Sequence, residues 1–61
     1  MQFRPTSNEI GKAAYEAYRN SVDGKSVAGT ELPDWDNIGT PVQNGWKLAA
    51  EAVRHKVEAA Q

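Results

Sequence analysis

A chain of 61 residues forms at most one domain, and a domain of this length buries only about 60% of the surface that its unfolded chain exposes. It has no cysteine and one histidine, which excludes disulfides and thiolate metal sites, and no stretch approaches the roughly 20 apolar residues of a membrane span. A net charge of −1 argues against sequence-independent binding of DNA, which depends on clustered Lys and Arg. We therefore expect one small cytoplasmic domain over residues 1–61, stabilised by homo-oligomerisation.

The first main helix is predicted over about 7–22, behind a capping box. Thr6 can accept a hydrogen bond from the first free amides, and Glu9 can reach back to the amide of Thr6. Asp23-Gly24 should end the helix, because glycine readily takes the left-handed conformation that follows a helix end. Gly11 and the alanines of this helix are small enough for another helix to approach closely. Its expected inner side carries Ile10, Ala13, Ala14, Ala17 and Tyr18.

A structured loop is expected next, with glycine pivots at Gly24 and Gly29. Beyond it, Leu32, Trp35 and Ile38 lie three residues apart. That spacing suits a one-turn helix over about 33–37 that presents these apolar side chains to one neighbour.

The second main helix is predicted over about 41–58. Thr40 is expected to be its N-cap, Pro41 its first helical residue, and Gln43 the side chain that completes a capping box. Apolar residues then recur at helical spacing and form one stripe, which the rest of the chain should cover. The stripe consists of Val42, Trp46, Ala49, Ala50, Val53 and Val57.

These elements predict an all-α fold, a helical hairpin without a sheet. No stretch alternates apolar and polar residues with the period of a strand. Trp35 and Trp46 are expected to be wedged between the two arms.

Gly24-Lys25-Ser26 matches the end of a phosphate-binding loop. The full motif needs a glycine where this chain has Arg19, and a strand before it, where this chain has a predicted helix. Two interpretations stay open. Lys25 and Ser26 contact an anionic ligand from a flexible loop, or they form a solvated turn.

The aromatic residues also have two interpretations. Trp46 and Tyr18 are predicted to belong to the core, as rings at helical spacing usually do. Trp35, on a connecting segment between two aspartates, or Tyr15 is a candidate for an exposed ring that stacks on a base beside Arg and Lys.

No catalytic or metal site is expected. Glu31, Asp34 and Asp36 lack the ligand spacing of a calcium-binding loop, and His55 lies between two cations near a helix end, where positive charge is favoured. The sequence contains no nucleophile with a matched base. We therefore expect a non-enzyme without a cofactor.

Several short segments between residues 8 and 54 carry a resemblance, and they are Ala14-Tyr15-Glu16-Ala17-Tyr18, Gly24-Lys25-Ser26, Gly29, Leu32-Pro33-Asp34-Trp35, Gln43-Asn44-Gly45-Trp46 and Ala49-Ala50. In these segments the chain resembles small α-helical proteins encoded by tailed bacteriophages and prophages. The order of helix, glycine loop, Pro-x-Trp turn and Gln-x-x-Trp helix is also similar to half of a ryanodine-receptor-type repeat. These resemblances imply a phage accessory protein in the cytoplasm of a host bacterium.

Two functions compete for such an accessory protein. The first is an anti-defence sponge, an oligomer that sequesters a cyclic or linear nucleotide messenger of bacterial immunity in pockets between protomers. Cations would neutralise its phosphates, Ser26 would contact it, and Tyr15 or Trp35 would stack on its base. The second is a module that docks an apolar helix face on a host or phage protein and blocks it. Basic and aromatic residues beside a glycine loop favour the sponge, with Arg4, Lys12, Arg19 and Lys25 as its cations.

Overall fold

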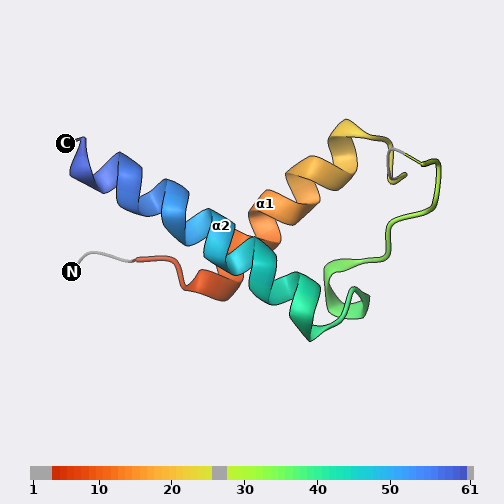
Figure 1. The fold of residues 1–61 in the computed structure, drawn as a ribbon, viewed down its shortest axis with the longest axis horizontal. Coiled ribbons are helices and arrows are strands. Elements are labelled where there is room, and N and C mark those ends of the chain that lie inside the picture. The colour runs from red at the N-terminus through yellow and green to blue at the C-terminus, as the bar shows by residue number, and fades with distance from the viewer. Residues whose placement is uncertain (1–3, 26–27, 61) are drawn as a thin grey trace.

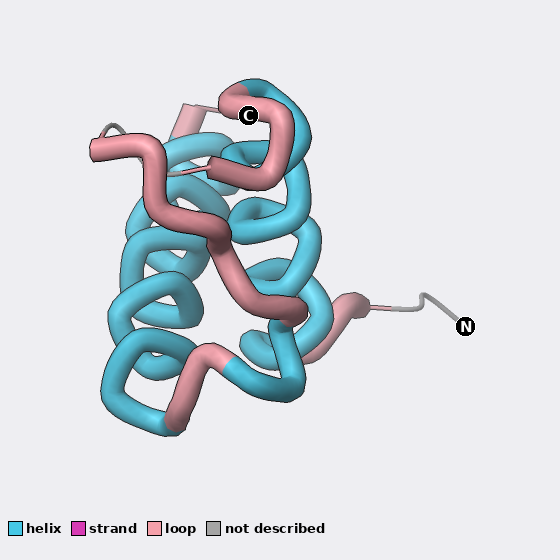
Figure 2. The backbone as a smooth tube through the Cα atoms, turned by 90° about the vertical axis from the view of Figure 1, so that its right-hand side faces the viewer, coloured by secondary structure: helices cyan, strands magenta, loops and turns pink. Residues whose placement is uncertain are grey.

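A computed structural model describes residues 4–25 and 28–60 of the chain. They form α1 (Ser7–Ser21), a short 3-10 helix η1 (Trp35–Asn37) and α2 (Thr40–Ala59). In Figure 1 the two long helices cross each other like the arms of an X, with α1 running up to the right and α2 running up to the left. Viewed from the loop end, the connecting segment passes in front of both helices (Figure 2). The described residues contain no strand, so the predicted all-α hairpin is confirmed.

α1 begins and ends as its sequence predicts. The Thr6 hydroxyl accepts a hydrogen bond from the Glu9 amide at 3.1 Å, and the Glu9 carboxylate accepts one from the Thr6 amide at 2.9 Å. At the other end Asp23 and Gly24 both have positive φ, 54° and 77°. The Gly24 amide donates to the carbonyl of Arg19 at 2.7 Å, which caps the helix.

α2 begins one residue earlier than predicted, and the expected capping box at Thr40 is wrong. Gly39 is the N-cap, with φ at 88°, and Thr40 is already helical. Glycine takes this left-handed conformation at little cost, so the chain enters the helix before Thr40 can act as a cap. The Gln43 side chain instead donates to the carbonyl of Trp35 at 2.6 Å and ties η1 to α2.

The core is a cluster of four aromatic rings. Tyr15 and Trp35 are its buried members, at 2% and 4% exposure, with ring centroids 6.0 Å apart. Trp46 is half-buried, and its ring lies edge-on to Tyr15 at 5.6 Å and 5.4 Å from Tyr18. The Tyr15 hydroxyl donates to the carbonyl of Pro33 at 2.6 Å. The core is therefore centred on Tyr15 and Trp35, and the rings expected inside, Trp46 and Tyr18, lie at its margin.

The helices meet most closely at Gly11. A Cβ atom on this residue would lie 2.9 Å from Lys47 Cγ and 3.0 Å from Lys47 Cα. The absence of a side chain therefore allows α1 to touch the backbone of α2, as the small residues of α1 predict.

Candidate functional site

Arg19 and Lys25 share a shallow cavity where α1 meets the loop. The volume of this cavity is about 210 Å³. An isolated antiparallel β-bridge pairs Lys25 with Glu31 across the loop. Arg19 is already engaged, because its Nε donates to the carbonyl of Leu32 at 3.0 Å and its NH2 lies 3.5 Å from an Asp34 carboxylate oxygen. Two carboxylates lie among the cavity residues, which are Arg19, Asp23, Gly24, Lys25, Glu31 and Leu32.

The four predicted cations do not form one patch within the chain. Arg4 pairs with Glu58 at 3.2 Å, beyond the N-terminal end of α1. Arg19 is twelve residues after the first residue of α1, about 18 Å farther along the helix axis. Lys12 is exposed between these two ends. Ser26, the remaining polar residue of the predicted site, lies outside the described residues.

The prediction that Tyr15 or Trp35 offers an exposed ring is corrected by their burial. The two rings pack against each other, and Tyr15 also packs against Trp46. Neither ring has a free face for a base, because η1 folds Trp35 back onto α1 instead of leaving it on an open connection.

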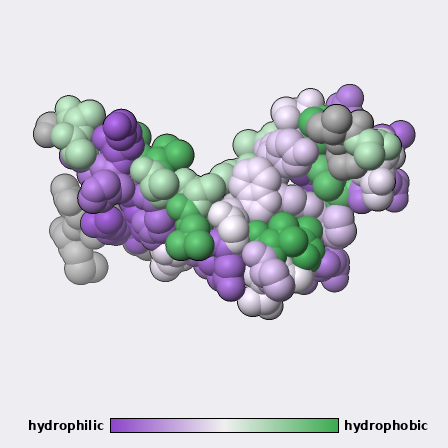
Figure 3. All heavy atoms as spheres, viewed as in Figure 1, coloured by the Kyte–Doolittle hydropathy of each residue, from purple (hydrophilic) through white to green (hydrophobic). Residues whose placement is uncertain are grey.

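The main unpartnered feature is an apolar face shared by the two helices. On α2, Val42, Val53 and Val57 are 47%, 63% and 52% exposed. Beside them runs an apolar groove of about 270 Å³, lined by Ile10, Ala14, Ala50, Val53 and Arg54. Apolar atoms gather in the middle of the face seen in Figure 3. We define the two-helix face as Ile10, Ala14, Ala17, Val42, Ala49, Ala50, Val53 and Val57.

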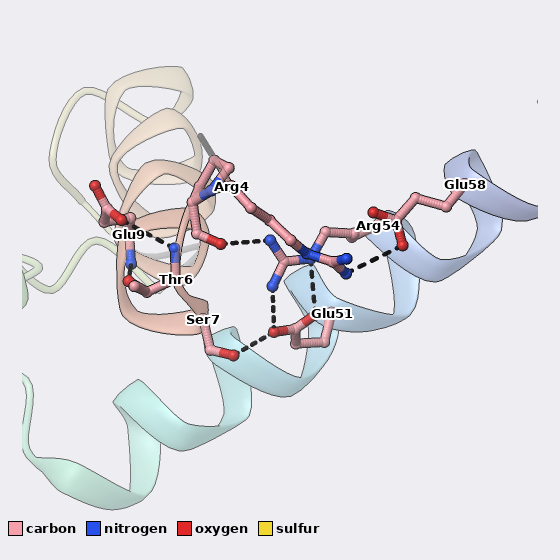
Figure 4. A network of polar contacts seen from close by, with 8 residues as sticks. Arg4, Thr6, Ser7, Glu9, Glu51, Arg54 and Glu58 are labelled. Atoms are coloured by element: carbon pink, nitrogen blue, oxygen red, sulfur yellow. Dashed lines mark hydrogen bonds and ion pairs between the residues drawn. The ribbon is translucent and has the colours of Figure 1, made fainter. Parts of the chain in front are cut away.

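A polar clasp holds the start of α1 against α2 (Figure 4). The Glu51 carboxylate accepts hydrogen bonds from Arg54 at 2.6 and 3.0 Å and a further one from the Ser7 hydroxyl. Arg54 also donates to the carbonyl of Pro5. These bonds, first those from Arg54 and then that from Ser7, lower the pKa of Glu51 from 4.5 to about 2. The clasp is a structural ion pair with satisfied partners.

The clasp explains why the apolar stripe of α2 is not covered, contrary to the sequence prediction. Lys47 and Glu51 contact α1, and Arg54 donates to Pro5 just before α1. Lys47, Glu51 and Arg54 each directly follow a member of the stripe, so this contact line lies about 100° around the helix from the stripe. Trp46 and Ala50 reach the margin of the contact, whereas Val42, Val53 and Val57 are left to solvent.

Sequence reasoning missed this second line of contacts. A signal for it was present, because Lys47, Glu51 and Arg54 recur at helical spacing and Glu51 and Arg54 can pair three residues apart.

Metal and membrane sites receive no support from the described part of the chain. Within residues 4–25 and 28–60, no group of three His, Asp or Glu side chains could hold a metal ion. No helix there is both long and apolar enough to cross a membrane.

Comparison of the chain with protein-family models, with curated proteins and with solved structures finds no match. The resemblances to phage proteins and to half of a ryanodine-receptor-type repeat therefore stay predictions.

Proposed function

We propose that this chain is a non-enzymatic protein-interaction module that binds through the two-helix face. The observation that carries the proposal is the exposure of Val42, Val53 and Val57 beside an apolar groove. Contiguous exposed apolar surface of this kind is typical of interaction sites. Burial of such surface contributes about 25 cal/mol for each Å² removed from water, which supplies a driving force for association.

The shape of the face suits an apolar helix as the bound element. Ala14 and Ala50 are small, so side chains of a partner can enter the groove between them. Arg54 lines the groove, but its guanidinium is held by Glu51, so it does not demand an acidic partner. The face therefore fits a partner that presents apolar side chains at helical spacing.

The nucleotide sponge stands second. The cavity beside Arg19 and Lys25 supports it, since both cations reach one space. Asp23 and Glu31 also line that space and would repel phosphates, and the rings expected to stack on a base are buried. An origin in a phage and an anti-defence role rest on the resemblance described above.

Substitution of the face tests the proposal. Val53→Glu places a charge on the face, whereas Leu48→Glu places the same charge about 140° around α2, on a side chain that is 72% exposed. The parent and both variants are used as immobilised baits in a lysate of the cells that express the chain. We expect the parent and Leu48→Glu to retain the same protein at a fixed ratio and Val53→Glu to lose it. Equal capture by all three baits would contradict the proposal.

Native mass spectrometry with linear and cyclic nucleotides separates the two functions. A nucleotide retained by the parent at fixed stoichiometry, and lost when Arg19→Ala and Lys25→Ala are combined, would favour the sponge. Absence of bound nucleotide from both proteins is the result that protein binding predicts.

A further inference from the structure

The two-helix face carries a ridge and a groove side by side. Val53 and Val57 project from α2, and Val53 also forms one wall of the groove that Ile10, Ala14 and Ala50 line. Resting on the function proposed above, we infer that the occupant of this face is the same face of a second copy of the chain. A two-fold axis brings the ridge of each copy to the groove of the other, so one surface supplies both halves of the interface.

The surface area of the chain agrees with a dimer. The chain exposes 4739 Å², about 800 Å² more than the roughly 3,900 Å² expected for a compact monomer of 6.7 kDa. One partner in a standard protein interface contributes about 800 Å². The radius of gyration is 13.0 Å, against about 10.5 Å expected for a compact chain of this length. The excess surface therefore matches what one copy would bury in a stable dimer.

The thin core favours a second copy over an unrelated protein. Among the described residues, Tyr15 and Trp35 are the apolar side chains that the chain buries by itself. A domain with so little burial gains stability from association, and the stabilising partner must be present whenever the chain folds. A second copy of the chain meets that condition, because it is made wherever the first copy is made.

Charge allows two identical faces to meet. The two-helix face consists of apolar side chains, and Arg54 at its groove is paired with Glu51 within its own chain. Lys56, three residues after Val53, is exposed at the rim, where its ammonium stays in water. Two-fold pairing therefore buries no unpaired charge from either copy.

Sedimentation equilibrium from micromolar to millimolar concentration tests the inference. We expect the parent and Leu48→Glu to reach twice the 6.7 kDa mass of the chain. Val53→Glu should raise the dimer dissociation constant at least about 100-fold, because each copy would bury an unpaired carboxylate. Circular dichroism of each variant shows whether its helices remain.

A second measurement does not depend on a folded variant. In a mixture of isotope-labelled and unlabelled parent chains, we expect intermolecular nuclear Overhauser effects between the methyl groups of Val53 or Val57 and those of Ile10 or Ala14. Their absence from a dimer would overturn the proposed interface.

The failure of this inference differs from the failure of the proposed function. If the parent stays monomeric and Val53→Glu still abolishes capture of another protein, the inferred dimer is wrong but the proposed function is not contradicted. Self-association and capture that are both insensitive to Val53→Glu would overturn the inference and the proposed function together.

Discussion

Gly11 of α1 lies so close to Lys47 of α2 that a Cβ atom on the glycine would come within 3.0 Å of the Lys47 Cα. This contact brings the line of Lys47, Glu51 and Arg54 toward α1. The apolar stripe, one residue earlier at each turn, is consequently turned about 100° away from that contact line, so Val53 and Val57 stay exposed while Trp46 still packs against Tyr15. The close contact between Gly11 and Lys47 therefore helps to leave the two-helix face exposed, and this is the face to which we assign the function.

Gly11→Ala should destabilise the chain, although alanine is the better helix former. The added methyl group overpacks the contact with Lys47 at a cost of about 1–3 kcal/mol, against a gain of about 1 kcal/mol in helix propensity. We expect a net loss of about 1 kcal/mol in the free energy of unfolding, measured by urea denaturation. Gly45→Ala is the matched control, because a Cβ atom there meets nothing within 4 Å, and it should stabilise by up to about 1 kcal/mol. Stabilisation by both variants would contradict the close approach.

Thr6→Ala and Thr40→Ala should differ in stability. Thr6 caps α1 through the Glu9 amide, so its removal should cost about 1 kcal/mol. Thr40 is helical and follows the cap residue Gly39, so Thr40→Ala should leave the denaturant midpoint nearly unchanged. An equal loss in both variants would show that Thr40 caps α2 after all.

Trp35→Ala should destabilise more than Trp46→Ala. Trp35 is 4% exposed and its loss should cost about 3–5 kcal/mol, enough to unfold a small domain. Trp46 is half-buried at the margin of the cluster, so its truncation removes less buried surface. Thermal unfolding followed by circular dichroism compares the two variants. A lower melting temperature for Trp46→Ala than for Trp35→Ala would show that the core is centred on Trp46 and not on Trp35.

Glu51 should make the fold sensitive to acid. Its pKa is about 2 in the folded chain and about 4.5 in the unfolded one, so the folded state favours the carboxylate. The resulting stability is fully present above about pH 4.5 and is lost as the pH falls toward 2. Glu51→Gln removes this contribution, so its unfolding free energy should depend less on pH over that range than that of the parent. Parallel pH profiles for the two proteins would argue against the clasp.

The sequence predicted the elements of the fold well because their signals are local. The capping box at Thr6 and Glu9, the stop at Asp23-Gly24 and the short turn around Trp35 each depend on neighbouring residues. The start of α2 was misjudged because Gly39 can enter the helix with positive φ, a freedom that competes with a threonine cap.

The candidate site was harder to predict, since it depends on how one helix is rotated against the other. Periodicity identified the stripe of α2 correctly but could not tell whether α1 covers it. The rotation follows from the contact at Gly11 and from the bonds that tie Ser7 to Glu51 and Pro5 to Arg54, which join residues far apart in the chain. The burial of Tyr15 and Trp35 likewise depends on the fold of the whole loop.

Protection of a single cysteine tests most directly whether the two-helix face is an interface. The chain has no cysteine of its own, so Val53→Cys and Leu48→Cys each introduce one thiol, on the face and away from it. The rate of maleimide labelling is measured as the protein concentration rises. We predict that labelling of Val53→Cys slows with concentration while that of Leu48→Cys stays constant. Labelling of both variants at rates independent of concentration would contradict a face that a second copy covers.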